Sequence, residues 1–113
     1  MNKYVNLDYL NSVVSGDEKV KREIIEMFFS QVDELSEALK TALKENDYEK
    51  ISFSAHTLKS TLRIMGIENI AQKMEILQNL SAKKESPEEY SGLINYFLEN
   101  IPFAISELKE VIK

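Results

Sequence analysis

The sequence predicts an all-α protein, an antiparallel up-down four-helix bundle with an additional short helix at the N-terminus. Apolar residues recur at alternating spacings of three and four, which places them on one stripe of a helix. Only three glycines and two prolines occur among the 113 residues, so long helices with short turns are expected. No window shows the sustained alternation of a β-strand. Short connections make consecutive helices antiparallel, and four such stripes bury one another in a bundle.

Length and composition favour one domain over residues 1–113. Hydrophobic residues make up 43% of the chain and cysteine is absent, which excludes disulfides and thiolate metal sites. A metal site of other ligands is disfavoured because the chain has one histidine, and we expect no bound metal. The net charge of −5 argues against a nucleic-acid partner. No apolar run is long enough to cross a membrane and the N-terminus lacks an apolar signal core, so a soluble, cytoplasmic domain is expected.

The first two helices follow from their apolar positions and one capping residue. A short amphipathic helix near the N-terminus carries Leu7, Leu10, Val13 and Val14. Gly16 ends it, and Asp17 can cap the next helix by accepting hydrogen bonds from exposed backbone N–H groups. The second helix is predicted over about residues 18–46, and its buried stripe is Ile24, Phe28, Val32, Leu35, Leu39 and Ala42.

The third and fourth helices are separated by a glycine. Asp47 is the predicted cap of the third helix, over about residues 48–65, whose stripe is Ile51, Ala55, Leu58, Leu62 and Met65. Gly66 then occupies the position after a helix end, where a left-handed backbone is common and glycine adopts it freely. The fourth helix covers about residues 68–82, with inward-facing Ile70, Met74 and Leu77.

The last helix has the clearest start signal. Ser86 is the predicted cap, Pro87 takes the first helical position, and Glu89 completes a capping box. The apolar stripe that follows is Tyr90, Leu93, Phe97, Ile101, Ala104, Leu108 and Val111. Pro102 lies inside this helix and predicts a kink or break, because proline removes one backbone hydrogen bond.

The one histidine of the chain, His56, lies on the third helix in the segment SAHTLKSTLRIMG. At about 100° per residue its side chain points roughly 140° from the centre of the buried stripe, toward solvent. Ser52, Ser60 and Arg63 fall within about 40° of it, and Lys59 within about 60°. The two small serines, one turn below and one turn above, leave the ring reachable by a docking partner.

These side chains together are suited to hold a phosphoryl group. A histidine titrates near neutral pH, so a large neutral fraction offers a nucleophilic nitrogen. Phosphoryl transfer depends on positioning and charge stabilisation, and Lys59 and Arg63 supply positive charge beside the phosphoryl oxygens. A lone surface histidine next to lysine and arginine is, however, usually only a solvated helix face, and the angles alone leave that alternative open.

The segment resembles the signature of histidine-containing phosphotransfer (HPt) domains, A-H-x-L-K-G followed by a second glycine after five further residues. The pattern is met by Ala55, His56, Leu58, Lys59 and Gly66. The resemblance covers essentially the whole chain, with a short first helix, a long second helix and the histidine midway along the third. Ser60 departs from it, since the family usually has glycine there for close approach of a partner. A slower transfer rate or a narrower range of partners is the resulting hypothesis.

The resemblance implies a phosphorelay intermediate. His56 would accept a phosphoryl group from a receiver-domain aspartate and pass it to another receiver, and Lys59 would help to stabilise it. Gln78 has the spacing of a glutamine that hydrogen-bonds the histidine in some members; a bundle-edge polar residue is an equal alternative. The implied partners are response-regulator receivers and a hybrid histidine kinase, with Mg²⁺ supplied by the receiver and this chain a monomer. No ATP-binding segment is recognisable, so the chain is not expected to be an ATP-dependent kinase.

Three other functions stay open. The main alternative is a non-catalytic helical adaptor that only docks to a receiver or kinase. The others are the dimerisation helices of a sensor kinase, although Thr57 stands where an acidic residue typically follows the histidine, and an unrelated helical adaptor. The docking surface is also open. We favour packing of Phe53, Thr57 and Ile64 under the first helix; the alternative is that some of this apolar surface meets a receiver, together with Leu7, Leu10 and Val13.

Overall fold

The computed structural model describes residues 3–113, so residues 1–2 of the predicted domain and N-terminal segment lie outside the described part. The chain forms α1 (Asp8–Val14), α2 (Glu18–Glu45), α3 (Tyr48–Ile64), α4 (Glu68–Ala82), a short 3₁₀ turn η1 (Pro87–Glu89) and α5 (Tyr90–Val111). Residues 3–113 contain no strand. The predicted all-α class and the predicted order of helices are confirmed.

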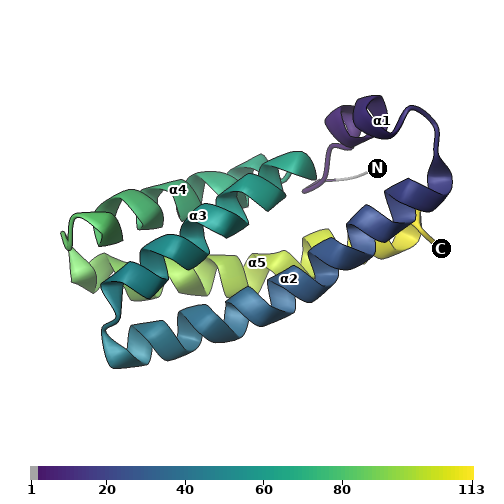
Figure 1. Ribbon diagram of the computed structural model, residues 1–113. Coiled ribbons are helices and arrows are strands. Elements are labelled where there is room, and N and C mark those ends of the chain that lie inside the picture. Colours follow the sequence, from purple (N-terminus) through teal and green to yellow (C-terminus); the bar gives the residue numbers. More distant parts are fainter. Residues whose placement is uncertain (1–2) are drawn as a thin grey trace.

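The four long helices α2 to α5 lie side by side, and α1 sits at one end of them (Figure 1). The molecule is 43 Å along its longest axis. The 28 residues of α2 span about 42 Å at 1.5 Å per residue, so this helix runs the whole length of the bundle. Helices α3 and α4 make the most extensive contact of any pair. The site on α3 is therefore supported chiefly by α4.

Two of the three predicted caps form. The Asp17 and Asp47 side chains accept hydrogen bonds of 3.1 Å from the backbone N–H groups of Val20 and Lys50. The prediction of a capping box at Ser86 was wrong. The backbone of this residue is left-handed (φ 49°), and its side chain makes no capping hydrogen bond. A capping residue needs an extended backbone, and here the chain reverses too tightly between α4 and α5 to provide one.

The core follows the predicted stripes with small shifts around two helices. Ile25 and Ile94 are buried, while their predicted neighbours Ile24 and Leu93 are half-buried. Each helix packs against two others, so the centre of its buried face lies between two neighbouring stripes. Val13 is 56% exposed, contrary to the amphipathic pattern of the first helix.

Helix α5 runs through Pro102 without the predicted break. Proline 102 is exposed, and the buried residues Ile101 and Ala104 hold the helix against the bundle on both sides of it. Burial of these side chains offsets the one backbone hydrogen bond that proline removes. The helix therefore continues for 22 residues.

The N-terminal segment before α1 is tied across the end of the bundle. The Glu107 carboxylate on α5 accepts hydrogen bonds of 3.1 Å from the backbone N–H groups of Lys3, Tyr4 and Val5. The Asn6 N–H then donates to the Met65 carbonyl at the end of α3, over 3.2 Å. These contacts hold α1 beside the C-terminal end of α3.

Candidate functional site

His56 lies on the outer face of α3 and is exposed to solvent. The opposite face of this helix is anchored by Ala55, Leu58 and Leu62, all fully buried. The predicted orientation of the histidine is thus confirmed. A rigid, well-packed helix presents an accessible imidazole.

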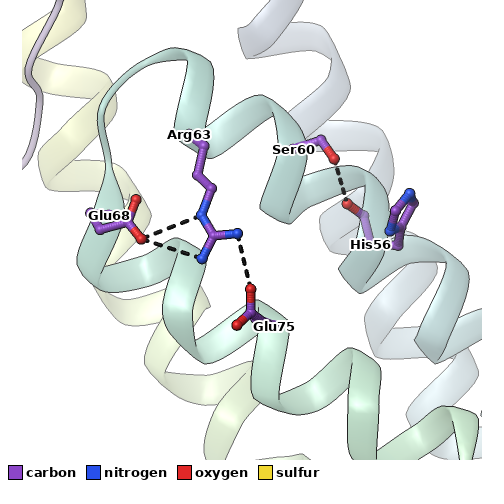
Figure 2. Close-up of polar contacts among 5 residues, drawn as sticks. All are labelled: His56, Ser60, Arg63, Glu68 and Glu75. Carbon is purple, nitrogen blue, oxygen red and sulfur yellow. Dashed lines mark hydrogen bonds and ion pairs between the residues drawn. The ribbon is translucent and has the colours of Figure 1, made fainter.

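The two serines that flank His56 direct their hydroxyl protons to backbone carbonyls. Ser60 Oγ donates to the carbonyl oxygen of His56 over 3.2 Å, one turn back on the same helix (Figure 2). Ser52 Oγ donates to the carbonyl oxygen of Gln78 over 3.4 Å and so links α3 to α4. Both side chains lie along the helix surface, which keeps the imidazole ring uncovered.

Arg63 turns toward α4, away from His56 (Figure 2). Its Nη1 lies 2.9 Å from a Glu75 oxygen, and its Nη2 lies 3.3 Å from a Glu68 oxygen. The hydrogen bond to Glu75 is the main cause that raises the pKa of Arg63, and Glu68 adds to it. The expectation that Arg63 supplies charge beside a phosphoryl group does not fit this arrangement, because both carboxylates already neutralise it. The helical angle placed its Cα correctly, but the long side chain follows its partners on another element.

Lys59 lies one turn along α3 from His56 and is half-buried. It forms no ion pair with any group in residues 3–113. Of the two cations predicted beside the histidine, Lys59 is therefore the one whose charge is not already neutralised by a carboxylate.

A hollow of about 450 Å³ opens beside His56, between α3 and α4. Its lining comprises Glu49, Ser52, Phe53, His56, Gln78, Ser81, Ala82 and Lys84. The Gln78 Oε1 atom is buried and accepts no hydrogen bond within the described chain. Buried polar atoms are nearly always paired, so an unpaired one beside an exposed imidazole points to a contact that another state of the site supplies.

Lys84 is the cation in this hollow, and sequence reasoning did not predict it. It lies in the turn after α4, 28 positions after His56, and no helical spacing connects the two. Only the antiparallel packing of α3 on α4 brings them to one cavity. No signal in the sequence alone distinguishes Lys84 from the other surface lysines.

Apolar side chains are exposed around the site. Phe53 is 68% exposed, so the favoured prediction that it packs under the first helix was wrong. A groove of about 220 Å³ runs between α2 and α3, lined by Ile24, Met27, Phe28, Gln31, Thr61, Ile64 and Met65. Met27 is 71% exposed in it. Exposed apolar side chains thus lie on both sides of α3, Phe53 beside His56 and Met27 in the groove with α2.

Within residues 3–113, no group of three or more histidine, cysteine, aspartate or glutamate side chains is arranged to hold a metal ion. None of the helices in the same range combines the length and the apolar character required to span a membrane.

Comparison with known proteins agrees with the motif. The family model described as "Hpt domain" matches residues 23–111 of the chain. The chain belongs to the Hpt domain family. Its similarity to HPt domains, first inferred from the segment around His56, is thereby confirmed. Helices α2 to α5 of this Hpt domain, with His56 midway along α3, lie within the matched range.

One curated relative is a phosphorelay protein. The Hpt domain described here is 36% identical over 67 residues to the phosphorelay intermediate protein YPD1 of Candida albicans (strain SC5314 / ATCC MYA-2876). The match covers 59% of this chain and 36% of the relative, so the matched segment spans about a third of that protein's length. The search of solved structures gave no significant match.

Proposed function

We propose that this Hpt domain is a phosphorelay intermediate, in which His56 receives a phosphoryl group from a receiver-domain aspartate and passes it to another receiver. The observation that carries the proposal is an exposed imidazole on a well-packed helix, beside a hollow lined by Gln78, whose buried Oε1 has no hydrogen-bond partner within residues 3–113. Membership of the Hpt family and the similarity to a phosphorelay intermediate support it.

The transfer requires little from the protein beyond position and charge. A ring nitrogen of neutral His56 uses its lone pair to attack the phosphorus of the aspartyl phosphate. The N–P bond forms as the P–O bond to the aspartate breaks, and the carboxylate leaves with the bonding electrons. The other ring nitrogen keeps its proton, so no separate base is needed. Transfer to a second receiver is the same step in reverse.

Gln78 is proposed to fix the orientation of the ring. Gln78 lines the same hollow as His56, and its buried Oε1 accepts no hydrogen bond within residues 3–113, so a rearrangement of the two side chains would let a ring N–H donate to it. That hydrogen bond selects which nitrogen keeps the proton and which one attacks. Lys59 is proposed to stabilise the phosphoryl oxygens, since it lies one turn away on α3 and has no carboxylate partner within residues 3–113.

The partner surface is proposed to be the exposed apolar face around His56. Met27 on α2, Phe53 on α3 and Val13 on α1 are each more than half exposed. Exposed apolar groups of this size are typical of an interface, and Phe53, which lines the hollow beside His56, would exclude water from the ring when a partner covers it. Receiver domains and a hybrid histidine kinase are the proposed partners.

The receiver is proposed to supply the Mg²⁺ of the reaction, because transfer begins at its phosphorylated aspartate. We also propose that the chain acts as a monomer, since α2 to α5 of one chain already complete the bundle. A molar mass near 13.0 kDa from light scattering would agree with this, and twice that value would favour a paired kinase-type helix bundle.

The test is transfer from a ³²P-phosphorylated receiver domain to wild type and to His56→Gln, with both proteins checked for folding by circular dichroism. Label that appears on wild type alone, and that is labile to acid but stable to base, supports the relay. Label on both proteins would place the phosphoryl group elsewhere.

A docking module without phosphotransfer is the second candidate, and the exposed apolar face is the observation that favours it. Binding to a receiver by calorimetry, without transfer of label from several receivers, would replace the relay with this function.

A further inference from the structure

We propose that Lys84 binds the phosphoryl group carried by His56, from the wall of the hollow that α4 and its following turn provide. This rests on the proposed phosphotransfer function and assigns to it a second cation on a different element. Lys84 and His56 line the same hollow of about 450 Å³, although 28 positions separate them in the sequence.

The packing of α3 on α4 sets the distance between the two residues. Ser52 Oγ bonds the Gln78 carbonyl, which aligns the turn before His56 with this part of α4. Lys84 lies six residues beyond Gln78, and His56 four residues beyond Ser52 in the opposite direction. The axial separation is therefore on the order of 10–15 Å at 1.5 Å per residue. The long stem of Lys84 and a phosphoryl group on His56 would have to point toward each other along the hollow to span this separation.

The turn that carries Lys84 is held firmly. The Lys84 N–H donates to the Ser81 carbonyl over 3.1 Å, and the Glu85 N–H donates to the Leu80 carbonyl over 2.9 Å. The buried Tyr90 hydroxyl lies 2.7 Å from the Glu85 carbonyl oxygen and 3.1 Å from that of Leu80. The backbone of Lys84 is thus fixed next to the hollow, and its side chain is exposed.

Within residues 3–113 no carboxylate is bonded to Lys84, although Asp47 and Glu49 line a second hollow together with it. Arg63, in contrast, is bound by two carboxylates. Glu49 is the one carboxylate among the residues that line the first hollow, and it would repel a phosphoryl group there. Lys59 stands on α3 and Lys84 after α4, so the two cations would contact the phosphoryl oxygens from different elements.

Phosphoramidate, a small phosphoryl donor, tests this without a docking partner. The rate of His56 phosphorylation would be followed by ³¹P NMR for wild type, Lys84→Gln and the control Lys83→Gln. Lys83 is an exposed neighbour with the same charge that does not line the hollow. We expect Lys84→Gln to be about two- to five-fold slower, the range for one exposed charge contact, and Lys83→Gln to match wild type. Equal slowing in both variants would overturn the proposal, because it would reflect net charge alone.

Two further variants separate a contact from a stability effect. Lys84 has φ 57°, which glycine adopts without strain, so Lys84→Gly should be at least as stable as wild type yet slow in phosphorylation. Glu49→Gln should be faster than wild type, because it removes the repelling charge. Wild-type rates in Lys84→Gln and Lys84→Gly would overturn the role of Lys84 and leave the relay intact. Absence of any label on wild type, from phosphoramidate and from receivers, would instead remove the proposed function itself.

Discussion

The carbonyl oxygen of Asn6 occupies the place where a Cβ atom at position 66 would lie, so Gly66 is required by contact as well as by backbone conformation. The sequence accounts for one of these reasons, since Gly66 follows a helix end and has φ 68°. The other comes from the N-terminal segment, whose Asn6 N–H bonds the Met65 carbonyl as it passes over the α3–α4 turn. The second glycine of the family signature thus also positions α1.

Replacement of Gly66 by alanine should lower the free energy of unfolding by about 2–4 kcal/mol, because strain from positive φ and a backbone overlap add together. Gly16→Ala is the matched control, with φ 85° and open space around the new methyl group, and should lose only about 1–2 kcal/mol. Urea denaturation of both variants measures the difference. Equal losses would show that the approach of Asn6 has no energetic consequence.

Arg63→Gln should leave phosphoryl acceptance by His56 close to wild type and reduce stability by no more than about 1 kcal/mol. The reason is that the guanidinium group binds Glu68 and Glu75 at the exposed α3–α4 edge, where salt screens such pairs. Transfer kinetics and urea denaturation at low and high salt check both parts. A loss of transfer rate as large as that of Lys59→Gln would show that Arg63 does contribute to binding the phosphoryl group.

Alkaline pH should destabilise the protein through Tyr90. Burial, with smaller contributions from Tyr48, Glu85 and Glu88, raises the pKa of Tyr90 above the ordinary value of 10.0. The unfolded chain therefore releases this proton first, so the stabilising contribution is complete below pH 10 and is lost as pH rises through the folded-state pKa.

Thermal unfolding of wild type and Tyr90→Phe between pH 8 and pH 11 measures this effect. At pH 8 the variant should be less stable by about 1–2 kcal/mol, because the carbonyls of Leu80 and Glu85 lose the hydroxyl that lies against them. The gap between the two proteins should narrow above pH 10. A constant gap across the range would exclude Tyr90 as the titrating group.

Ser60→Gly should accelerate transfer from a receiver while lowering stability by about 0.5–1 kcal/mol. Glycine removes the side chain that stands one turn from the ring, but glycine within a helix is unfavourable. Ser60→Ala is the control: it removes the hydroxyl that donates to the His56 carbonyl and keeps the methylene bulk, so its rate should stay near wild type. If the glycine variant is no faster than the alanine variant, the serine does not obstruct docking.

Much of the bundle was accessible from spacing because each helix buries a stripe whose period is a property of the backbone. The caps at Asp17 and Asp47 form as expected because they depend only on neighbouring residues. Spacing alone does not fix which residues are buried most deeply. Ile24 was the predicted core residue but Ile25 is the buried one, because the centre of a buried face depends on which helices flank it. Ser86 was predicted incorrectly for a similar reason, because the tight turn between α4 and α5 overrides a local capping pattern.

The sequence by itself determined the helices, the family signature and the outward direction of His56, all of which follow from residues within a few turns of one another. Tertiary structure alone decided the surroundings of that histidine: Arg63 is held by carboxylates on α4, Gln78 has a buried oxygen without a partner in the described part of the chain, and Lys84 lines the same hollow. The physical reason is one of range. Helical periodicity fixes where each Cα lies on its own helix, whereas the partners of a long polar side chain are set by which helices pack together and in what register.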